Sequence, residues 1–393
     1  MSGPPLASAT AGVPAMSRRQ RLVTALSHRQ PDRVPLDLGT TVVTGIALKT
    51  YERLKTSLHI DPGPTRVFDR RNQLAVVDDE VLGALDIDTR PVCAGAPENR
   101  PVVEAADQEG FTDEWGSLNV RPPDVDTYFI ANAPLAGEIS LHDILRYPWP
   151  DPDDPGRTRN LRSQAEALRA KDDRALVMAI PGSIIQMSQL LRGFEDWYID
   201  VAANPDLIGA LLDQIAEIQI AIAGNLLAAV GDLLDALFIY DDLAMQDRLV
   251  VSYRHYQKLI EPRLRKYVQS LRSKTSAKIV HHNDGAIVPV LDSLADMGID
   301  AVNPVQVSAK GMGDVADLKR RFGGRLCFWG AIDTQTTLPL GTPAAVAAEV
   351  RARIQALNQD GGYVCGAVHN IQADIPEENV LALYRAARAE AYA

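Results

Sequence analysis

Cysteine is scarce in this chain of 393 residues, which contains only Cys93, Cys327 and Cys365. Three cysteines in a chain of this length do not form a disulfide framework, and none of them belongs to a C-x-x-C pair. Such sparse, unpaired cysteines are typical of a reducing compartment, so we expect a cytoplasmic protein.

Positive charge is also in short supply, because 40 Lys and Arg stand against 51 Asp and Glu and give a formal net charge of -11. The field of such a molecule repels phosphate groups, which argues against nonspecific binding to nucleic acid or anionic lipid. The most apolar run, residues 215–230, contains Glu217 and is shorter than the roughly 20 residues that span a bilayer. We therefore predict no nucleic-acid partner and no membrane span.

Two further signals are missing from the sequence. The first sixteen residues, "MSGPPLASATAGVPAM", have neither the basic start nor the long apolar stretch of a secretory signal, and we predict a disordered lead-in over 1–16. No G-x-G-x-x-G or Walker sequence follows any expected strand, which argues against the nucleotide-binding form of a doubly wound sheet. Residues 17–393 are predicted to form a single domain.

From residue 174 onwards, short apolar runs alternate with helical segments. The runs are "ALVMAI", "DALFIYDD", "AKIVHHND", "GIDAVNPVQ", "RLCFWGAID" and "GGYVCGAVHN", and "RVPLDLG" adds an earlier one. Alternating strands and helices predict a parallel sheet. Seven strands, with an eighth expected between residues 40 and 170, predict an α/β fold of the (β/α)8 TIM-barrel type. Short extended pieces within residues 76–128 predict a hairpin-rich insertion in its N-terminal half.

Helix starts carry their own signals in the later part of the chain. Thr342 precedes Pro343, which is typical of a helix cap followed by proline in the first turn. Asp374, with Glu377 three residues later, resembles a capping box.

Polar side chains gather where the predicted strands end. In a barrel all carboxyl ends of the strands open on one mouth, so residues far apart in sequence converge there. The candidates are Asp37, Asp241, Asp242, His282, Asp284, Asn303, Gln306, Asp333, Gln335, His369 and Asn370. This is the pattern of an active site.

His282, Asp284 and His369 offer two imidazoles and one carboxylate, a set suited to a metal that keeps open positions for substrate or water. Zinc, iron and manganese all fit these donors. The structural alternative is that these residues cap the following helices. His281 points to the opposite face of the strand and is expected to be packed or to support its neighbour.

The other candidates keep two interpretations each. Asp241 and Asp242 are candidate catalytic residues, as general base or further metal ligand, or they mark a helix start; Asp37 is a weaker catalytic candidate. Arg192 binds a substrate carboxylate or forms an ion pair with Glu195 or Asp196. Trp329 lines a pocket or belongs to the core. The residues assigned to substrate binding are Gln186, Arg192, Asn303, Gln306, Trp329, Asp333 and Asn370.

Several segments together resemble the uroporphyrinogen decarboxylase superfamily, particularly its methyltransferase-like branches that work with corrinoid proteins. They are "SRRQRLVTALSHRQPDRVPLDLG", "DEWGS", "PWPDPDDPGR", "HHNDG", "GIDAVNPVQ", "FWGAIDTQTTLPLGTP" and "HNIQADIPEENVLALYRAAR". The resemblance implies a (β/α)8 barrel with its active site at the carboxyl end, a small-molecule substrate and, as partner, a corrinoid-binding protein. A homodimer would fit the same family.

The zinc methyltransferases of that superfamily hold their metal with a His-x-Cys-Gly motif and a later cysteine. This chain keeps His282 and Gly285, but has Asp284 and His369 where the two cysteines would stand. The replacements shift the ligands from sulfur towards nitrogen and oxygen. The arginine-rich N-terminal signature of the tetrapyrrole decarboxylases is absent, and "RVPLDLG" stands in its place.

Three functional hypotheses follow. The first is a metal-dependent methyltransferase that moves a methyl group between a corrinoid or methylated small molecule and an acceptor. The second is a decarboxylase of an aromatic or heterocyclic carboxylic acid, with Arg192 and Asp37 as its candidate groups. The third is a barrel that only binds a ligand or a corrinoid protein. The polar residues expected at the mouth argue against the third, because such groups are costly to bury unless they are paired or used.

Overall fold

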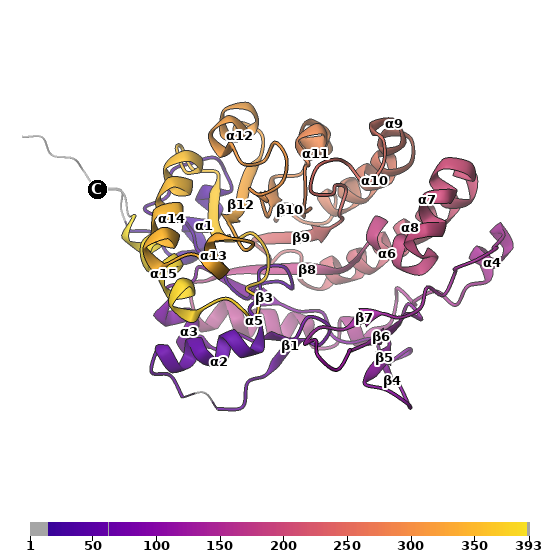
Figure 1. Cartoon of the computed structure of the whole chain (residues 1–393), viewed down its shortest axis with the longest axis horizontal. Helices are drawn as coiled ribbons and strands as arrows, with labels where there is room; N and C mark the ends of the chain where they lie inside the picture. Colours follow the sequence, from indigo (N-terminus) through magenta and orange to yellow (C-terminus); the bar gives the residue numbers. More distant parts are fainter. Residues whose placement is uncertain (1–14, 62, 391–393) are drawn as a thin grey trace, which may run out of the picture.

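The computed structural model describes residues 15–61 and 63–390. Seven parallel strands form one sheet in the order β13-β12-β11-β10-β9-β8-β3, in which each strand pairs with its neighbour along the chain. The strands are β3 (Thr89–Val92), β8 (Ala175–Ser183), β9 (Ala236–Tyr240), β10 (Lys278–His282), β11 (Ala301–Asn303), β12 (Cys327–Ile332) and β13 (Tyr363–Ala367). Figure 1 shows helices around these strands.

The segment 34–38 closes the sheet into a barrel. Leu36 forms a parallel bridge with Cys365 of β13, where the Cys365 amide donates to the Pro35 carbonyl (2.9 Å). On its other side the Asp88 amide, just before β3, donates to the Leu36 carbonyl (2.9 Å). The seven strands and the segment 34–38 together form a closed ring of eight, which confirms the predicted (β/α)8 fold. The eighth strand is β3, which lies inside the region that the sequence assigned to the insertion.

The outer layer consists of helices that follow the strands, with shorter helical pieces in the connections. The helices are α1 (Arg18–Ala25), α2 (Leu48–Ser57), α3 (Asp79–Ala84), α4 (Leu141–Arg146), α5 (Leu161–Lys171), α6 (Ile185–Arg192), α7 (Phe194–Ala203), α8 (Pro205–Val230), α9 (Tyr253–His255), α10 (Glu261–Arg272), α11 (Leu291–Met297), α12 (Val315–Phe322), α13 (Thr337–Leu340), α14 (Pro343–Leu357) and α15 (Glu377–Ala389). Turns of other types are Pro155–Arg157, Tyr256–Ile260 and Val288–Val290.

Of the two predicted helix starts, one is confirmed and the other is wrong. The Thr342 hydroxyl accepts a hydrogen bond from the Ala345 amide (3.2 Å) and caps α14, as expected. The prediction for Asp374 is wrong, because α15 begins after Pro376 and has no side-chain cap. α8 is long and apolar enough to cross a membrane by length and composition, but 56% of its most apolar window is buried inside the protein. It therefore has the character of a core helix.

An antiparallel sheet of short strands lies outside the ring, at the lower right of Figure 1. It contains β4 (Val103–Glu104), β5 (Gly110–Thr112), β6 (Leu118–Val120) and β7 (Phe129–Ile130), and β1 (Val67–Asp69) pairs separately with β2 (Leu74–Ala75). The four-stranded sheet confirms the hairpin-rich insertion. The lead-in predicted for residues 1–16 lies, apart from its last two residues, outside the described residues.

Aspartates at the amino ends of the strands join neighbouring strands. The carboxylates of Asp88, Asp235 and Asp300 accept hydrogen bonds from the backbone amides of Leu36 (2.7 Å), Leu176 (2.8 Å) and Ile279 (2.7 Å), each on the preceding strand of the barrel. The backbone therefore gains an ionic partner at the end opposite the mouth.

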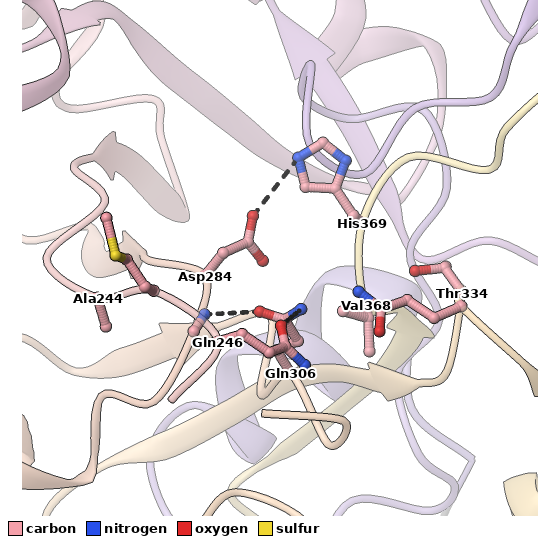
Figure 2. Close-up of a pocket in the computed structure, with 10 residues that line it drawn as sticks. Ala244, Gln246, Asp284, Gln306, Thr334, Val368 and His369 are labelled. Carbon is pink, nitrogen blue, oxygen red and sulfur yellow. Dashed lines mark hydrogen bonds and ion pairs between the residues drawn. The ribbon is translucent and has the colours of Figure 1, made fainter. Parts of the chain in front are cut away.

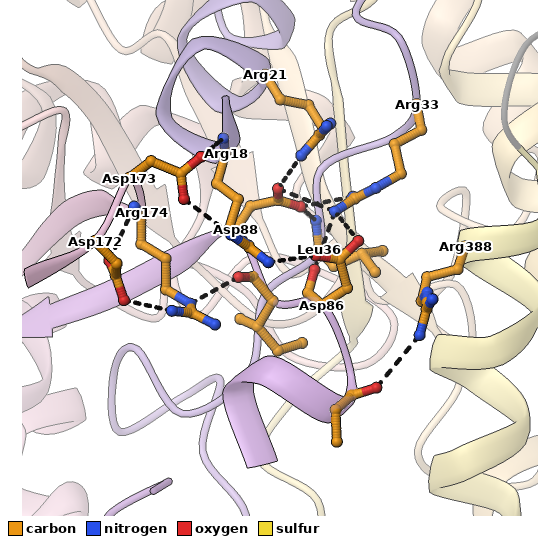
Figure 3. A network of polar contacts seen from close by, with 12 residues as sticks. Arg18, Arg21, Arg33, Leu36, Asp86, Asp88, Asp172, Asp173, Arg174 and Arg388 are labelled. Carbon is orange, nitrogen blue, oxygen red and sulfur yellow. Dashed lines mark hydrogen bonds and ion pairs between the residues drawn. The ribbon is translucent and has the colours of Figure 1, made fainter. Parts of the chain in front are cut away.

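Asp88 is the most buried member of this set. Its side chain is 0% exposed and lies between Arg21 (2.6 Å) and Arg33 (2.7 Å), and Figure 3 shows the two guanidinium groups converging on it. A buried charge is tolerated only when it is paired and fully hydrogen-bonded, and here both conditions hold.

We expect Asp88→Ala to lower the free energy of unfolding by about 3–5 kcal/mol, because it leaves two arginines buried without their shared partner and frees the Leu36 amide. Chemical denaturation measures this loss. Glu217→Ala, which removes one side of an exposed ion pair with Lys266, is the control and should change stability by no more than about 1 kcal/mol. Equal losses in the two variants would contradict the role assigned to Asp88.

Candidate metal centre

His282, Asp284 and His369 form a group at the carboxyl ends of β10 and β13 that could hold a metal ion. One ligand atom from each of the three residues lies within 4.8 Å of the others. The Asp284 Oδ2 atom is 3.6 Å from His282 Nε2 and 3.8 Å from His369 Nε2. Ligand atoms of a tetrahedral zinc lie about 3.3 Å apart, so these two contacts are only a few tenths of an ångström longer than in a zinc site.

Two asparagines fix the orientation of both imidazole rings. His282 Nδ1 donates to Asn303 Oδ1 (2.7 Å), and His369 Nδ1 donates to Asn370 Oδ1 (2.8 Å). The Asn303 amide is oriented in turn, because its Nδ2 donates to the Trp329 carbonyl (3.2 Å). With Nδ1 protonated, each ring directs the lone pair of Nε2 towards Asp284, which is the tautomer that a metal ligand requires.

Gly285 explains the form of the loop that carries Asp284. Its φ is +92°, and a Cβ at this position would lie 2.5 Å from the Met245 carbonyl oxygen. The Gly285 amide donates to Gln306 Oε1 (2.6 Å), and the next amide, that of Ala286, donates to the Met245 carbonyl (2.9 Å). The sharp turn after β10 therefore needs glycine, and it directs Asp284 into the mouth of the barrel.

The electrostatics of the cluster favour charge separation. Burial lowers the pKa of His282, but the hydrogen bond and charge of Asp284 outweigh this and raise it above the ordinary value. Burial raises the pKa of Asp284, but His282 and His369 outweigh it and lower the result. Burial lowers the pKa of His369 and keeps that ring neutral. Because its raised pKa favours the protonated ring, His282 has to release a proton when its Nε2 atom binds a metal ion.

The two adjacent aspartates that follow β9 have separate roles. Asp241 accepts hydrogen bonds from the amides of Ile184 (3.1 Å), Ile185 (2.7 Å) and Gln186 (3.2 Å), so it holds the first turn of α6. Burial raises its pKa to about 7, although the three amides oppose this shift. Asp241 thus has the helix-start role that the sequence left open for it.

Asp242 faces the metal cluster. Its carboxylate accepts from the Asp284 amide (3.2 Å) and from Gln186 Nε2 (3.3 Å). Burial raises its pKa, the charge of His282 opposes the rise, and the charge of Asp284 adds to it. A carboxyl group of raised pKa beside three candidate ligands is suited to accept a proton.

A cavity of about 400 Å³ opens beside the cluster. Figure 2 shows Asp284 and His369 facing each other across it, with Gln306 below Asp284 and Thr334 beside Val368. Side chains of Asp284 and His369 are 33% and 35% exposed, so solvent reaches both from the cavity. The lining consists of Ala244, Met245, Gln246, Asp284, Gly285, Gln306, Thr334, Gln335, Val368 and His369.

Of the seven residues predicted to bind substrate, Gln306 lines this cavity. Asn303 and Asn370 lie behind the histidines and contact them, and Gln186 contacts Asp242. Asp333 accepts from the amides of Gln335 (3.0 Å) and Thr336 (3.1 Å) in the turn before α13, and so shapes the loop that carries Thr334.

Arg192, Trp329 and Asp37 lie outside the cavity lining. Arg192 is buried and pairs with Asp200 (2.8 Å) and Asp196 (3.0 Å), the ion-pair alternative for this residue. Trp329 is a core residue, 1% exposed, whose Nε1 donates to Asp37 Oδ2 (2.9 Å). Asp37 also accepts from Thr40 and from Thr89, and burial raises its pKa. His281 is packed on the opposite face of β10, where burial lowers its pKa to about 3.

The sequence did not single out half of the lining. Met245 and Gln246 lie in the loop after β9, beyond the aspartates that drew attention, and Thr334 follows Asp333. The sequence did not predict a role for Tyr240 either. Its ring lies edge-on to the His282 ring, with 5.7 Å between the ring centroids. Gln335 carried a signal, as a polar residue at a strand end. Lining by loop residues depends on how each loop bends, which strand periodicity does not encode.

Comparison with known proteins places these observations in a family. The sequence model described as uroporphyrinogen decarboxylase (URO-D) matches residues 133–390. A uroporphyrinogen decarboxylase from Edwardsiella ictaluri (strain 93-146) is 25% identical over 264 residues, which cover 61% of this chain and 66% of that protein. The chain thus spans slightly less than two thirds of this relative's length.

A solved structure extends the comparison to the fold. A methyltransferase from Methanosarcina mazei is similar with a TM-score of 0.66 and 20% sequence identity, over 95% of this chain and 99% of that one. At this identity the similarity concerns the fold alone. Because the family's sequence model covers well over half of its length, this chain belongs to the uroporphyrinogen decarboxylase family.

Proposed function

We propose that this protein is a metal-dependent methyltransferase that moves a methyl group between a corrinoid, or a methylated small molecule, and an acceptor. The observation that carries the proposal is the His282–Asp284–His369 cluster, whose two Nε2 atoms face one carboxylate beside an open cavity. Metals with three protein ligands and an open position are typical of catalytic sites. The chemistry of the donors fits zinc, and iron or manganese is the alternative.

A metal held there would act as a Lewis acid that favours the deprotonated form of the acceptor. The chain's own residues supply the rest. Asp242 takes the acceptor's proton on its carboxylate, and Gln186 positions that carboxylate by donating to it. In the forward direction a bond forms between the acceptor heteroatom and the methyl carbon. The bond between that carbon and its donor breaks, and its electron pair stays with the donor.

The second candidate is decarboxylation of an aromatic or heterocyclic carboxylic acid, which the family name favours. Such a reaction needs a cation that places the carboxylate and an acid that protonates the developing carbanion. Arg192, the cation suggested by the sequence, is paired with Asp196 and Asp200 instead. We rank methyl transfer first for this reason, and because a barrel of the same fold is described as a methyltransferase.

A corrinoid-bound methyl group would arrive on a partner protein, since the cavity of about 400 Å³ accommodates a small acceptor but no tetrapyrrole. The scarcity of cysteine supports a cytoplasmic setting. A homodimer remains part of this proposal as a feature that fits the family.

The ligand assignment predicts the metal content of purified protein. His282→Ala and His369→Ala should lose near-stoichiometric metal, and Asn303→Ala should weaken its binding about 10–100-fold by releasing the His282 ring. Elemental analysis and chelator competition on tag-free protein measure this. His142→Ala, an exposed histidine on α4, is the matched control and should keep its metal. A wild type that stays metal-free after addition of zinc, iron and manganese would sink the assignment and favour decarboxylation.

The proton-handling role predicts the effect of Asp242→Asn. This change keeps an acceptor for the Asp284 amide but removes the base, so methyl transfer from a methylated corrinoid should slow by about 10²–10⁴-fold at unchanged metal content. Asp247→Asn alters an exposed aspartate five residues later and serves as the control. Full activity of Asp242→Asn would remove this residue from the mechanism. Release of carbon dioxide by the wild type from a panel of carboxylic acids would replace methyl transfer with the second candidate.

A further inference from the structure

The cavity beside the metal cluster lacks fixed positive charge. Within the described part of the chain, none of the residues that line it is lysine or arginine. Arg248 and Lys310 are the nearest cations along the lining loops, but neither side chain belongs to the lining, and Arg248 pairs with Asp247 (3.5 Å). An anionic group bound here would find no guanidinium or ammonium partner.

The carboxyl groups of the cluster disfavour a bound anion. The carboxyl groups of Asp242 and Asp284 lie next to each other at the cluster, where the Asp284 amide donates to Asp242 Oδ1 (3.2 Å). An added carboxylate or sulfonate would lie beside the Asp284 carboxyl group, with no lysine or arginine in the lining to pair with it.

Some neutral polar groups of the lining form hydrogen bonds with other residues of the protein, and others do not. Gln306 Nε2 donates to Gln246 Oε1 (3.1 Å), and Gln246 Nε2 donates to the Ser308 carbonyl (2.8 Å), so these two amides hold the loops together. The Thr334 hydroxyl and the Gln335 side-chain amide make no hydrogen bond to another described residue. They are the polar groups ready for a ligand, in a lining whose apolar members include Ala244, Met245 and Val368.

We propose that the acceptor is an uncharged small molecule, a neutral thiol or alcohol, whose second polar group binds Thr334 and Gln335, and that the cavity rejects anionic acceptors. This inference rests on the proposed methyl transfer at the metal cluster and names its substrate class. The cavity discriminates against anionic acceptors because it offers no positively charged side chain. A charged group that enters must lose its hydrating water without gaining an ionic partner.

The test compares thiols of similar size that differ in charge. The protein is loaded with cobalt(II), and binding is followed by the thiolate-to-cobalt absorption band. We expect 2-mercaptoethanol to bind about tenfold or more tightly than mercaptoacetate, the anionic analogue. Gln335→Arg should reduce this preference by adding a cation at the rim.

Ethanethiol, which lacks the hydroxyl group, tests the contact with Thr334 and Gln335. Wild type should bind 2-mercaptoethanol about fivefold more tightly than ethanethiol, a difference equal to one typical hydrogen bond. The double variant Thr334→Val/Gln335→Leu should bind the two alike. Because neither residue has a structural hydrogen bond through its side chain, the variants are expected to fold as wild type does.

The outcomes separate this inference from the proposed function. A cobalt-loaded protein that binds mercaptoacetate as well as 2-mercaptoethanol would overturn the substrate class and leave the metal centre in place. A protein that takes up no cobalt would overturn both proposals. Selectivity for the neutral thiol that persists in the double variant would overturn the assignment of Thr334 and Gln335.

Discussion

Closure of the barrel by the segment around Leu36 is the constraint on which the rest of the structure depends. Leu36 pairs with Cys365 on one side and bonds to Asp88 on the other, so the first and last strands meet. Only in a closed ring do the ends of β10 and β13 face each other across the mouth, and this brings His369 to Asp284. The ion pairs of Asp88 with Arg21 and Arg33 stabilise the junction at the opposite end, where they do not interfere with the site.

The polar groups at the mouth are arranged in two layers of different purpose. Asn303 and Asn370 contact the rings of the histidines and leave Nε2 free, while Asp241 holds the start of α6 and leaves the mouth to Asp242. Asp241 and Asp242 are adjacent in the sequence, yet the first holds a helix and the second faces the cluster. Their roles differ because successive positions at a strand end point in different directions. The site is therefore prepared for a cation before it binds, which reduces the reorganisation that binding requires.

The sequence predicted the parts of the fold whose periodicity is strong. Six apolar runs became β8 to β13, and polar residues at their ends identified the cluster of His282, Asp284 and His369. β3 was not located, because "TRPV" contains an arginine and a proline and lacks a long apolar run. Chain position alone could not show that Trp329 points into the core towards Asp37, or that Met245 and Gln246 return to the cavity, since both depend on three-dimensional contacts.

Membership of a decarboxylase family does not determine the chemistry of this member, because the reaction depends on the groups that the barrel presents at its mouth. A site for an anionic substrate needs cations in its wall, and the cavity described here has amides, a hydroxyl group and a thioether instead. Its negative charges are close together and face two imidazoles, an arrangement that a metal ion relieves and an anionic substrate would aggravate. The same electrostatic balance therefore supports both the metal and a neutral acceptor, and it would have to change at Asp242 or Asp284 before this barrel could favour a carboxylate.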